Sequence, residues 1–278
     1  MHPLSATTHA FINGLMCRHF PNHRGDLVEK LFLRVDDLFA GNFPGYQCSD
    51  TAYHDLRHTC EATATTARLL DGHLKGGSPP TIMARDFELA IAAILIHDSG
   101  YIKQTGDHEG TGAKYTLTHV QRSADFAGRL LPSLGVAAVE VRIVQSAIHC
   151  TEASVTVSKM KFASPVAKYI ACAVGTADVL SQMAASDYPE RLPDLYKEFV
   201  EAAAYSALNG TGIGSYRSVE DLLSRTREFY EMYVQRMLTE QWGGVYRDLE
   251  HHFGNGANEY LTAIEANLQR IDSLPAAC

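Results

Sequence analysis

Apolar residues recur every three or four positions along most of this chain, which is the spacing of one face of an α-helix. A stripe of this kind predicts a helix over residues 26–39: Leu27, Leu31, Val35 and Leu38. The same spacing predicts helices over about 51–74, 118–131, 136–149, 165–185, 195–208, 219–239 and 258–271. Segment 87–97 is apolar nearly all round, which is typical of a buried central helix. No stretch of alternating polarity is long enough to predict a strand, so we expect an all-α fold.

Composition narrows the class of protein. The chain has 278 residues, of which 46% are hydrophobic and 20% are charged, as is usual for a globular protein. A net charge of −8 argues against a surface that coats a nucleic-acid polymer. No apolar run reaches the roughly 18 residues that a membrane span needs. We also find no signal-peptide pattern near the N-terminus, so we expect a cytoplasmic protein without a membrane partner.

The six cysteines are widely scattered, and none of them forms a CxxC pair. In a chain of this length without a secretion signal, a disulfide framework is not expected. We interpret them as free thiols.

The most informative residues are histidines and aspartates that lie in apolar, helix-like surroundings. An imidazole or carboxylate that is buried without a partner costs free energy, and a metal ion is a common partner. A single buried histidine is more often a hydrogen-bonded core residue, but an ordered set is stronger evidence. Six such residues supply enough donors for two metals: His58, His97, Asp98, His119, His149 and Asp178.

The order of these residues resembles the HD superfamily, which is named for its adjacent His–Asp pair. The matching residues are His58, His97-Asp98 and Asp178. His119 and His149 resemble the branch of that superfamily that holds two metals. Residues 53–58, Tyr-His-Asp-Leu-Arg-His, also resemble the Tyr-His-Asn-x-x-His opening motif of cyclic-nucleotide phosphodiesterases, with Asp55 in place of Asn. The resemblance covers about residues 50–185.

The resemblance implies a fold and a domain plan. It implies an all-α, HD-domain helical bundle with additional C-terminal helices. We therefore predict one HD-type domain over residues 1–278, with a metal-binding core over about 50–185 and a helical extension over about 186–278.

The resemblance also implies a ligand set. His58, His97, Asp98 and Asp178 would hold one metal. His119, His149 and the second oxygen of Asp98 would hold the other, since a carboxylate can bridge two ions and an imidazole cannot. Mixed nitrogen and oxygen ligation suits Fe, Mn, Zn, Co or Ni, and the sequence does not choose among them. Neutral imidazoles are needed for binding, so we expect metal affinity to fall below about pH 6.

Three further residues are candidates for catalysis. His54 lies four positions before His58, on the same face of the predicted helix, and in the phosphodiesterases that it resembles this histidine protonates the leaving oxygen. Arg122 and Lys103 are candidates to hold a phosphate, with a solvated surface charge as the alternative.

Three more polar residues have weaker assignments. Glu61 and Glu152 could orient ligand imidazoles, and Gln182 could contact a base or sugar. For these three, simple exposure is the stronger expectation.

The leading functional hypothesis is a metal-dependent phosphohydrolase or phosphodiesterase. It would hydrolyse a small phosphoester, such as a nucleotide, by attack of a metal-bridged hydroxide on phosphorus. The alternative is a mixed-valent di-iron oxygenase of the HD type that acts on a small polyol or phosphonate, because the two chemistries share their ligands. A non-catalytic metal-holding module is a third hypothesis. The expected partner is a small phosphorylated molecule, and a homo-oligomer is left open.

Overall fold

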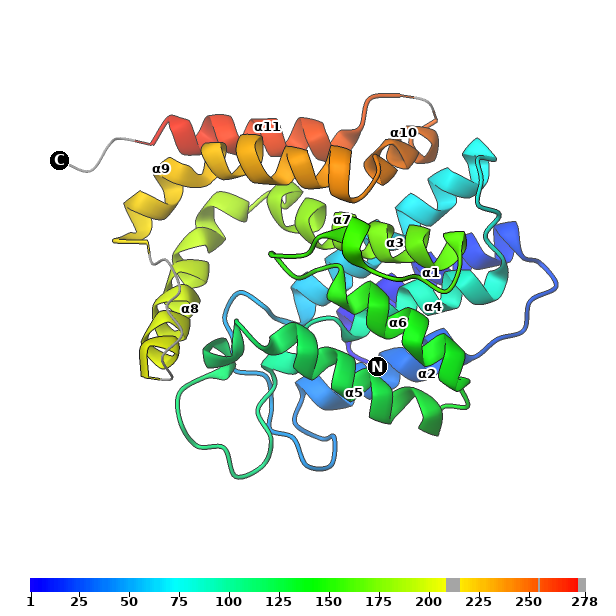
Figure 1. The fold of residues 1–278 in the computed structure, drawn as a ribbon, viewed down its shortest axis with the longest axis horizontal. Helices are drawn as coiled ribbons and strands as arrows, with labels where there is room; N and C mark the ends of the chain where they lie inside the picture. Colours follow the sequence, from blue (N-terminus) through cyan, green and yellow to red (C-terminus); the bar gives the residue numbers. More distant parts are fainter. Residues whose placement is uncertain (209–215, 255, 275–278) are drawn as a thin grey trace.

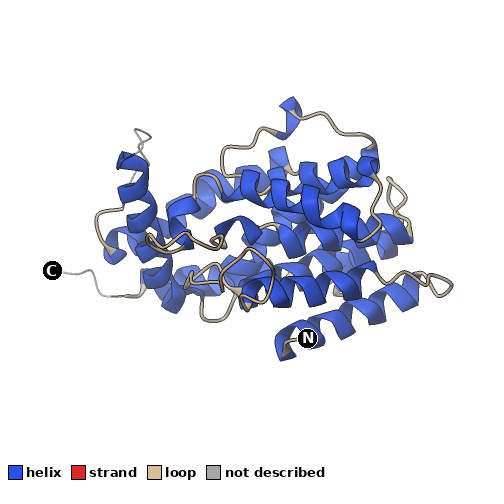
Figure 2. Cartoon of the chain, turned by 90° about the horizontal axis from the view of Figure 1, so that it is seen from below, coloured by secondary structure: helices blue, strands red, loops and turns tan. Residues whose placement is uncertain are grey.

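The computed structural model describes residues 1–208, 216–254 and 256–274, and Figures 1 and 2 show these parts as a packed set of helices. The all-α prediction is confirmed for the described residues, in which only two isolated β-bridges occur. The α-helices of the described residues are α1 (Pro3–His19), α2 (Leu27–Phe39), α3 (Leu56–Gly76), α4 (Ala84–Ile96), α5 (His119–Ser133), α6 (Ala138–His149), α7 (Pro165–Ala184), α8 (Tyr188–Leu208), α9 (Val219–Phe229), α10 (Asp248–His252) and α11 (Glu259–Asp272).

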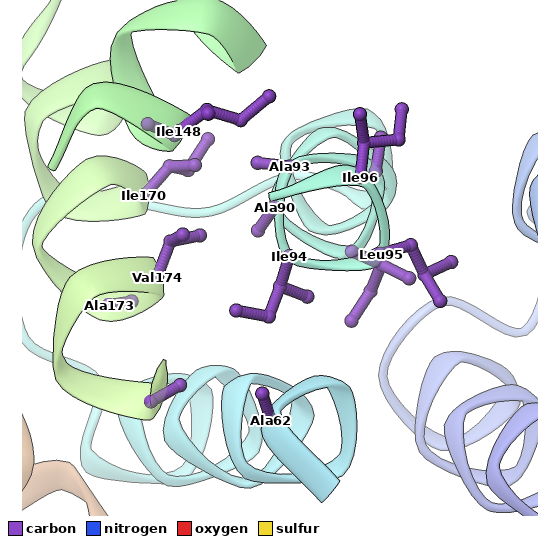
Figure 3. Packing of buried hydrophobic residues seen from close by; sticks show 14 of the residues in the cluster. Ala62, Ala90, Ala93, Ile94, Leu95, Ile96, Ile148, Ile170, Ala173 and Val174 are labelled. Carbon is purple, nitrogen blue, oxygen red and sulfur yellow. The ribbon is translucent and has the colours of Figure 1, made fainter. Parts of the chain in front are cut away.

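Helix α4 is the centre of the core. Every residue from Phe87 to Ile96 is buried, and α4 contacts α2, α3, α5, α6 and α7. Figure 3 shows Ala90 and Ala93 of α4 facing Ile170, Ala173 and Val174 of α7. Small side chains on α4 let neighbouring helices approach it closely, while its isoleucines and leucines fill the remaining space. The C-terminal end of α4 is therefore held in the middle of the molecule.

Helices α8, α9 and α11 cover one end of this core. In Figure 1, α9 and α11 lie side by side, and α8 lies beside the end of α9. After Phe229, the chain of α9 continues as two π-helical turns over Tyr230–Val234 and Met237–Gln241. The sequence pattern predicted a single helix over 219–239, and the wider π turns lie in its second half.

Helix α3 begins later than we predicted. Asp55 is its N-cap and accepts a hydrogen bond from the backbone N–H of His58 at 2.8 Å. The predicted start near residue 51 is therefore wrong, and His54 lies before the helix and does not share a helical face with His58. Asp and Asn are equally good N-caps, so Asp55 in place of the motif's Asn keeps this cap.

Helix α8 begins earlier than we predicted, at Tyr188 instead of Leu195. The predicted start follows two prolines, Pro189 and Pro193, which usually interrupt a helix. Pro189 lies in the first turn, where the backbone N–H groups have no partner within the helix, so a proline there costs little. Pro193 is accommodated inside the helix.

Two helices were not predicted at all. Helix α1 packs Ile12, Leu15 and Met16 into the core, and α10 is too short to give a periodic signal. Among the described residues, no helix is long and apolar enough to cross a membrane. The five described cysteines form no disulfide.

The contact between α3 and α10 generates a stability prediction. A Cβ atom at Gly72 would lie 1.8 Å from the backbone oxygen of Asp248, whereas a Cβ at the exposed Gly14 of α1 would meet nothing within 4 Å. We expect Gly72→Ala to lower the free energy of unfolding by about 1–3 kcal/mol through overpacking. Gly14→Ala is the matched control and should raise it by up to about 1 kcal/mol. Denaturant unfolding measures both, and equal effects would contradict this packing.

Candidate metal centre

The His97-Asp98 pair lies where α4 ends inside the core. His97 is fully buried and Asp98 is 4% exposed. The chain leaves α4 through a 3₁₀ turn, Ser99–Tyr101, that packs against α5. Gly100 permits this approach, because a Cβ there would lie 2.0 Å from the backbone oxygen of His119. The turn therefore brings the end of α4 against the first residue of α5.

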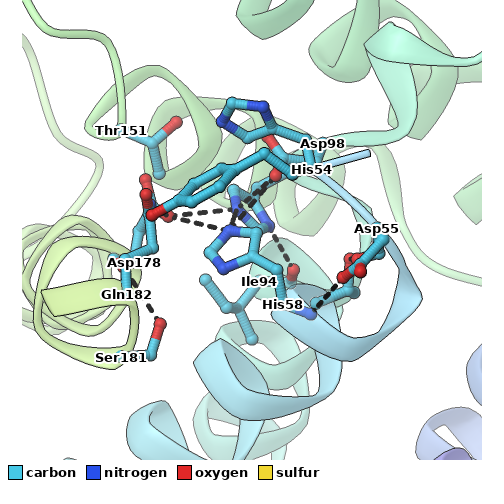
Figure 4. Close-up of polar contacts among 12 residues, drawn as sticks. His54, Asp55, His58, Ile94, Asp98, Thr151, Asp178, Ser181 and Gln182 are labelled. Carbon is cyan, nitrogen blue, oxygen red and sulfur yellow. Dashed lines mark hydrogen bonds and ion pairs between the residues drawn. The ribbon is translucent and has the colours of Figure 1, made fainter. Parts of the chain in front are cut away.

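Four side-chain atoms from three helices converge at this point. The Nε2 atoms of His58 and His97 are 3.3 Å apart, and Asp178 Oδ1 lies 3.2 Å from the first and 3.4 Å from the second. Asp98 Oδ2 lies 3.2 Å from both Nε2 atoms. Figure 4 shows His58, Asp98 and Asp178 pointing toward one another.

This arrangement fits a metal ion. In a tetrahedral site with bonds of about 2.0–2.1 Å, the ligand atoms lie roughly 3.3–3.4 Å from one another, close to the separations observed here. Asp98 Oδ2 is also buried and accepts no hydrogen bond, although both imidazoles are near it. A buried carboxylate oxygen without a hydrogen bond is costly, and a cation among these four atoms would satisfy it. His58, His97 and Asp178 thus form one candidate metal-binding group.

The neighbouring backbone sets the orientation of His97. Its Nδ1 lies 2.7 Å from the backbone oxygen of Ile94, one turn earlier in α4. A carbonyl oxygen only accepts, so in the neutral ring Nδ1 carries the proton and the lone pair of Nε2 faces the cluster. A backbone acceptor on the far nitrogen is typical of histidines that ligate metals.

The charges of the centre are unusual. In the described part of the chain, no Lys or Arg forms an ion pair with Asp98 or Asp178, and only imidazoles do so. Burial lowers the pKa of His58, but the hydrogen bonds and charges of Asp178 and Asp98 outweigh it and raise this pKa to about 9. The same carboxylates raise the pKa of His97 well above its usual range.

The pKa values of the two carboxylates shift in the opposite direction. Burial opposes ionisation of Asp98 and Asp178, but the neighbouring His97 and His58 outweigh it and lower both pKa values. The metal-free centre therefore holds protons on imidazoles that a cation would have to replace.

His119 and His149 lie next to this cluster. His119 is the first residue of α5, and its Nδ1 lies 2.7 Å from the backbone oxygen of Thr116, so its Nε2 is unprotonated in the neutral ring. That Nε2 lies 3.7 Å from Asp98 Oδ1, the oxygen that does not face His58 and His97. His149 is the last residue of α6 and lines the same cavity.

Asp98 and Asp178 of the cluster line a cavity of about 660 Å³, whereas His58 and His97 are not among its lining residues. We refer to the part of the lining formed by His54, Asp98, His119, His149 and Asp178 as the floor. Helices α8 and α9 and the π turn after α9 supply the opposite wall. The predicted C-terminal extension therefore supplies about a third of the residues that line this cavity.

His54 reaches the cavity from the loop before α3. Its Nδ1 lies 2.5 Å from Glu198 Oε2 of α8. Its ring stacks on Tyr101 with centroids 4.4 Å apart, and Tyr101 stacks in turn on His119 at 4.3 Å. Burial lowers the pKa of His54, but the charge and hydrogen bond of Glu198 outweigh it and raise this pKa above the usual value. His54 thus keeps its proton to a higher pH than a free imidazole does, and its ring orientation is fixed.

Arg122 and Lys103 do not line the cavity. The Arg122 guanidinium donates to the backbone oxygens of Gly100 and Ile102 at 2.6 and 3.1 Å and lies over the Tyr115 ring. The Lys103 ammonium is buried against Asp50 Oδ2 at 2.8 Å and the backbone oxygen of Gly110 at 2.6 Å. Both cations hold the loop after α4 in place. A phosphate-binding role for either stays a prediction, and it would require these contacts to break.

The three residues with weaker assignments each form a hydrogen bond in the structure. Gln182 Nε2 donates to Asp178 Oδ1 at 2.8 Å, so Gln182 supports a candidate ligand. Glu61 accepts from Arg57 at 2.8 Å, and Glu152 accepts from Ser154 at 2.7 Å. Sequence reasoning missed Glu198 and Tyr101. Tyr101 follows the His97-Asp98 turn closely enough to be a candidate, but nothing local marks Glu198.

Comparison with known protein families identifies the family of this chain. Residues 42–246, about three quarters of the chain, match the model of the Npun_R2479-like family, so the chain belongs to that family. The match spans all six predicted metal ligands and reaches through α9. No curated protein matches the chain.

The raised imidazole pKa values predict how metal binding depends on pH. A cation replaces protons on His58 and His97, so its apparent affinity should rise with pH until about pH 9, the pKa of His58 in the metal-free centre. The carboxylates are already ionised above pH 4 and add no dependence there. We expect about a tenfold gain per pH unit for each proton displaced between pH 6 and 8. Calorimetric titration with Zn²⁺ or Mn²⁺ measures this, and an affinity that levels off above pH 6.5 would contradict it.

The geometry also predicts metal stoichiometry. Asp98 has one oxygen near His58 and His97 and the other near His119, whereas His149 belongs only to the second group of the predicted ligand set. Elemental analysis should find two metals in the wild type, one in His149→Ala and none tightly bound in Asp98→Ala. Exposed His108→Ala is the control and should retain both. Full loading of Asp98→Ala would contradict the assignment.

Proposed function

We propose that this member of the Npun_R2479-like family is an HD-type, metal-dependent phosphohydrolase that cleaves a small phosphoester. The observation that carries the proposal is the His54–Glu198 pair. It places a proton donor with a raised pKa in the same cavity as the buried His–Asp cluster. A cleft with a metal-ligand cluster and a separate, oriented acid has the parts that ester hydrolysis requires.

Support for the HD assignment comes from where each residue lies. His58 is in the first turn of α3, and His97-Asp98 follows the end of α4. His119 opens α5, His149 closes α6, and Asp178 lies within α7. The fold class and this order agree with the HD-type bundle that the sequence resembles. We also propose that residues 1–278 form a single domain, because α8 and α9 complete the cavity.

The group of His58, His97 and Asp178 fits one cation, and we propose a second beside it. His58, His97, Asp98 and Asp178 would hold one, and His119, His149 and the other Asp98 oxygen would hold the second. Two bound divalent cations would supply Lewis acidity at a phosphoryl oxygen and would ionise a water molecule at neutral pH.

The other groups of the cavity position and transfer the proton. Glu198 accepts from His54 Nδ1 and thereby leaves Nε2 to face the cavity and donate to a leaving oxygen. Stacking on Tyr101 fixes the plane of the His54 ring. The hydrogen bond that Gln182 donates fixes the orientation of the Asp178 carboxylate. A general acid that is positioned in this way typically raises the rate 10²–10⁴-fold.

The His54–Glu198 pair also bears on the alternative, a di-iron oxygenase. Departure of an alkoxide needs a proton at the oxygen that leaves, which His54 can supply. Oxidation of a carbon–hydrogen bond has no such leaving group. The non-catalytic alternative would leave a cavity of about 660 Å³ above the cluster without a role.

A leaving-group comparison tests the acid. His54→Gln should lower kcat about 10²–10⁴-fold for an alkyl phosphodiester, whose leaving alkoxide needs a proton. The same variant should retain most activity on bis(p-nitrophenyl) phosphate, because p-nitrophenolate leaves without one. For the alkyl phosphodiester, the kcat of Glu198→Gln should lie between those of His54→Gln and the wild type, while that of His108→Gln should equal the wild-type value.

Metal content is measured in each variant, and His54→Gln should keep the wild-type amount. Equal losses on both substrates would contradict the acid role of His54. No hydrolysis of any phosphoester across Mn²⁺, Fe²⁺, Co²⁺, Ni²⁺ and Zn²⁺ would overturn the proposed function. Substrate-dependent oxygen uptake by the iron-loaded protein would favour the oxygenase.

A further inference from the structure

The cavity above the candidate metal centre has a charged floor and an apolar wall. Its floor contains Asp98, Asp178 and three histidines. Its wall and mouth contain mostly apolar and aromatic side chains: Leu117, Val120, Val179, Met183, Leu192, Leu195, Phe199, Tyr216, Leu222, Phe229 and Tyr233.

No lysine or arginine lines this cavity in the described part of the chain. Proteins usually hold phosphate groups that are not on a metal with Arg or Lys side chains or with helix N-termini. Arg122 and Lys103, the two cations that the sequence suggested for phosphate, are engaged with loop carbonyls and with Asp50. A second phosphate of a bound molecule would therefore meet no cation among the described lining residues.

The wall is built to contact an apolar body. Phe199 stacks on Tyr216 with centroids 5.7 Å apart, and Phe229 stacks on Tyr233 at 5.1 Å. Two of the lining residues are also exposed to solvent, Leu117 by 55% and Phe229 by 39%. A soluble protein that leaves large apolar side chains exposed at the mouth of a cavity commonly uses them for binding.

The volume limits the size of that body. About 660 Å³ lies in the middle of the range for sites that enclose drug-sized ligands. A molecule with one phosphate on the floor would leave most of this space for its remaining part.

We propose that the substrate is a phosphoester with a single phosphate and an apolar alkyl or aryl body, and that it is not a nucleoside polyphosphate or a sugar phosphate. This inference rests on the proposed phosphohydrolase function. The phosphate lies on the floor with the cations, and the body fills the space between α5, α7, α8 and α9. Specificity then comes from burial of apolar surface.

A homologous series of substrates tests the inference. The series consists of p-nitrophenyl alkyl phosphodiesters with methyl, butyl, hexyl and octyl chains, assayed below their micelle concentrations on the metal-loaded protein. The leaving group is the same throughout, so the chemical step is constant and only the body varies. Burial of each methylene should raise kcat/KM by about two- to fourfold until the cavity is filled.

A charged analogue sharpens the test. The octyl ester that ends in a carboxylate should react at least about tenfold more slowly than the octyl ester, because the wall supplies no partner for a second charge. p-Nitrophenyl thymidine 5′-phosphate, with its polar body, should react more slowly than the octyl ester as well.

Two variants locate the effect. Leu195→Ala should reduce kcat/KM for the octyl ester much more than for the methyl ester, whereas Leu33→Ala, at an exposed leucine on α2, should change neither. Phe229→Lys at the mouth should reduce the discrimination against the carboxylate-ended ester. Because Phe229 is partly exposed, this lysine can remain solvated and the fold should tolerate it.

The outcomes separate the two proposals. A kcat/KM that is flat or falls with chain length, on a methyl ester that is hydrolysed, would overturn the apolar-substrate inference and leave the phosphohydrolase function standing. A preference for the nucleoside ester over the octyl ester would do the same. If no member of the series, methyl included, is hydrolysed with any metal, the proposed function fails and the inference fails with it.

Discussion

Two buried carboxylates without a fixed cation are the constraint on which the structure depends. Asp98 and Asp178 are inside the molecule, and in the described residues only imidazoles form ion pairs with them. Burial of an ionised carboxylate is costly unless its charge is balanced. His58 of α3, Asp178 of α7 and the His97-Asp98 pair after α4 meet at this one point, and His119 of α5 lies beside it. Protonated imidazoles balance the charge when no metal is bound, and a cation takes over when one is.

Helix α8 contributes residues both to the His54 contact and to the apolar wall of the cavity. Glu198 on one side of α8 holds His54, and Leu195 and Phe199 line the cavity from the same helix. A change in the position of α8 would therefore alter both the acid and the space for the substrate. This coupling is the physical reason to treat residues beyond 185 as part of the site and not as an appendage.

The sequence was most informative where chemistry and local pattern coincide. A buried helix that ends in His97-Asp98 is visible without a structure, because the apolar run and the polar pair are adjacent in the chain. Helix identity was also predictable from periodicity, although the start of α3 was missed because Asp55 was not recognised as an N-cap. As a result, His54 was predicted to lie within the helix, whereas it lies in the loop before α3. Its position in the cavity agrees with the proton-donating role suggested for it.

Long-range partners were beyond the reach of the sequence. Glu198 is separated from His54 by 144 residues, and nothing around it distinguishes it from an exposed glutamate on a helix. For Arg122 the sequence suggested a partner, a phosphate group, but did not reveal the contacts that the side chain makes within the protein. In the structure its guanidinium donates to the carbonyls of Gly100 and Ile102. A guanidinium satisfies backbone carbonyls as readily as phosphate, so residue type alone cannot separate the two roles.

Among the described residues, the absence of lysine and arginine from the cavity lining also agrees with the needs of the centre. A fixed ammonium or guanidinium beside Asp98 or Asp178 would neutralise the carboxylate and repel a divalent cation, and both effects weaken metal binding. Charge interactions are strongest where water is excluded, so this competition would be largest in a dry, apolar cavity. A site that relies on bound cations to neutralise phosphate therefore benefits from walls without positive charge. Under the proposed function, the same walls would favour a substrate whose only charge is the phosphate itself.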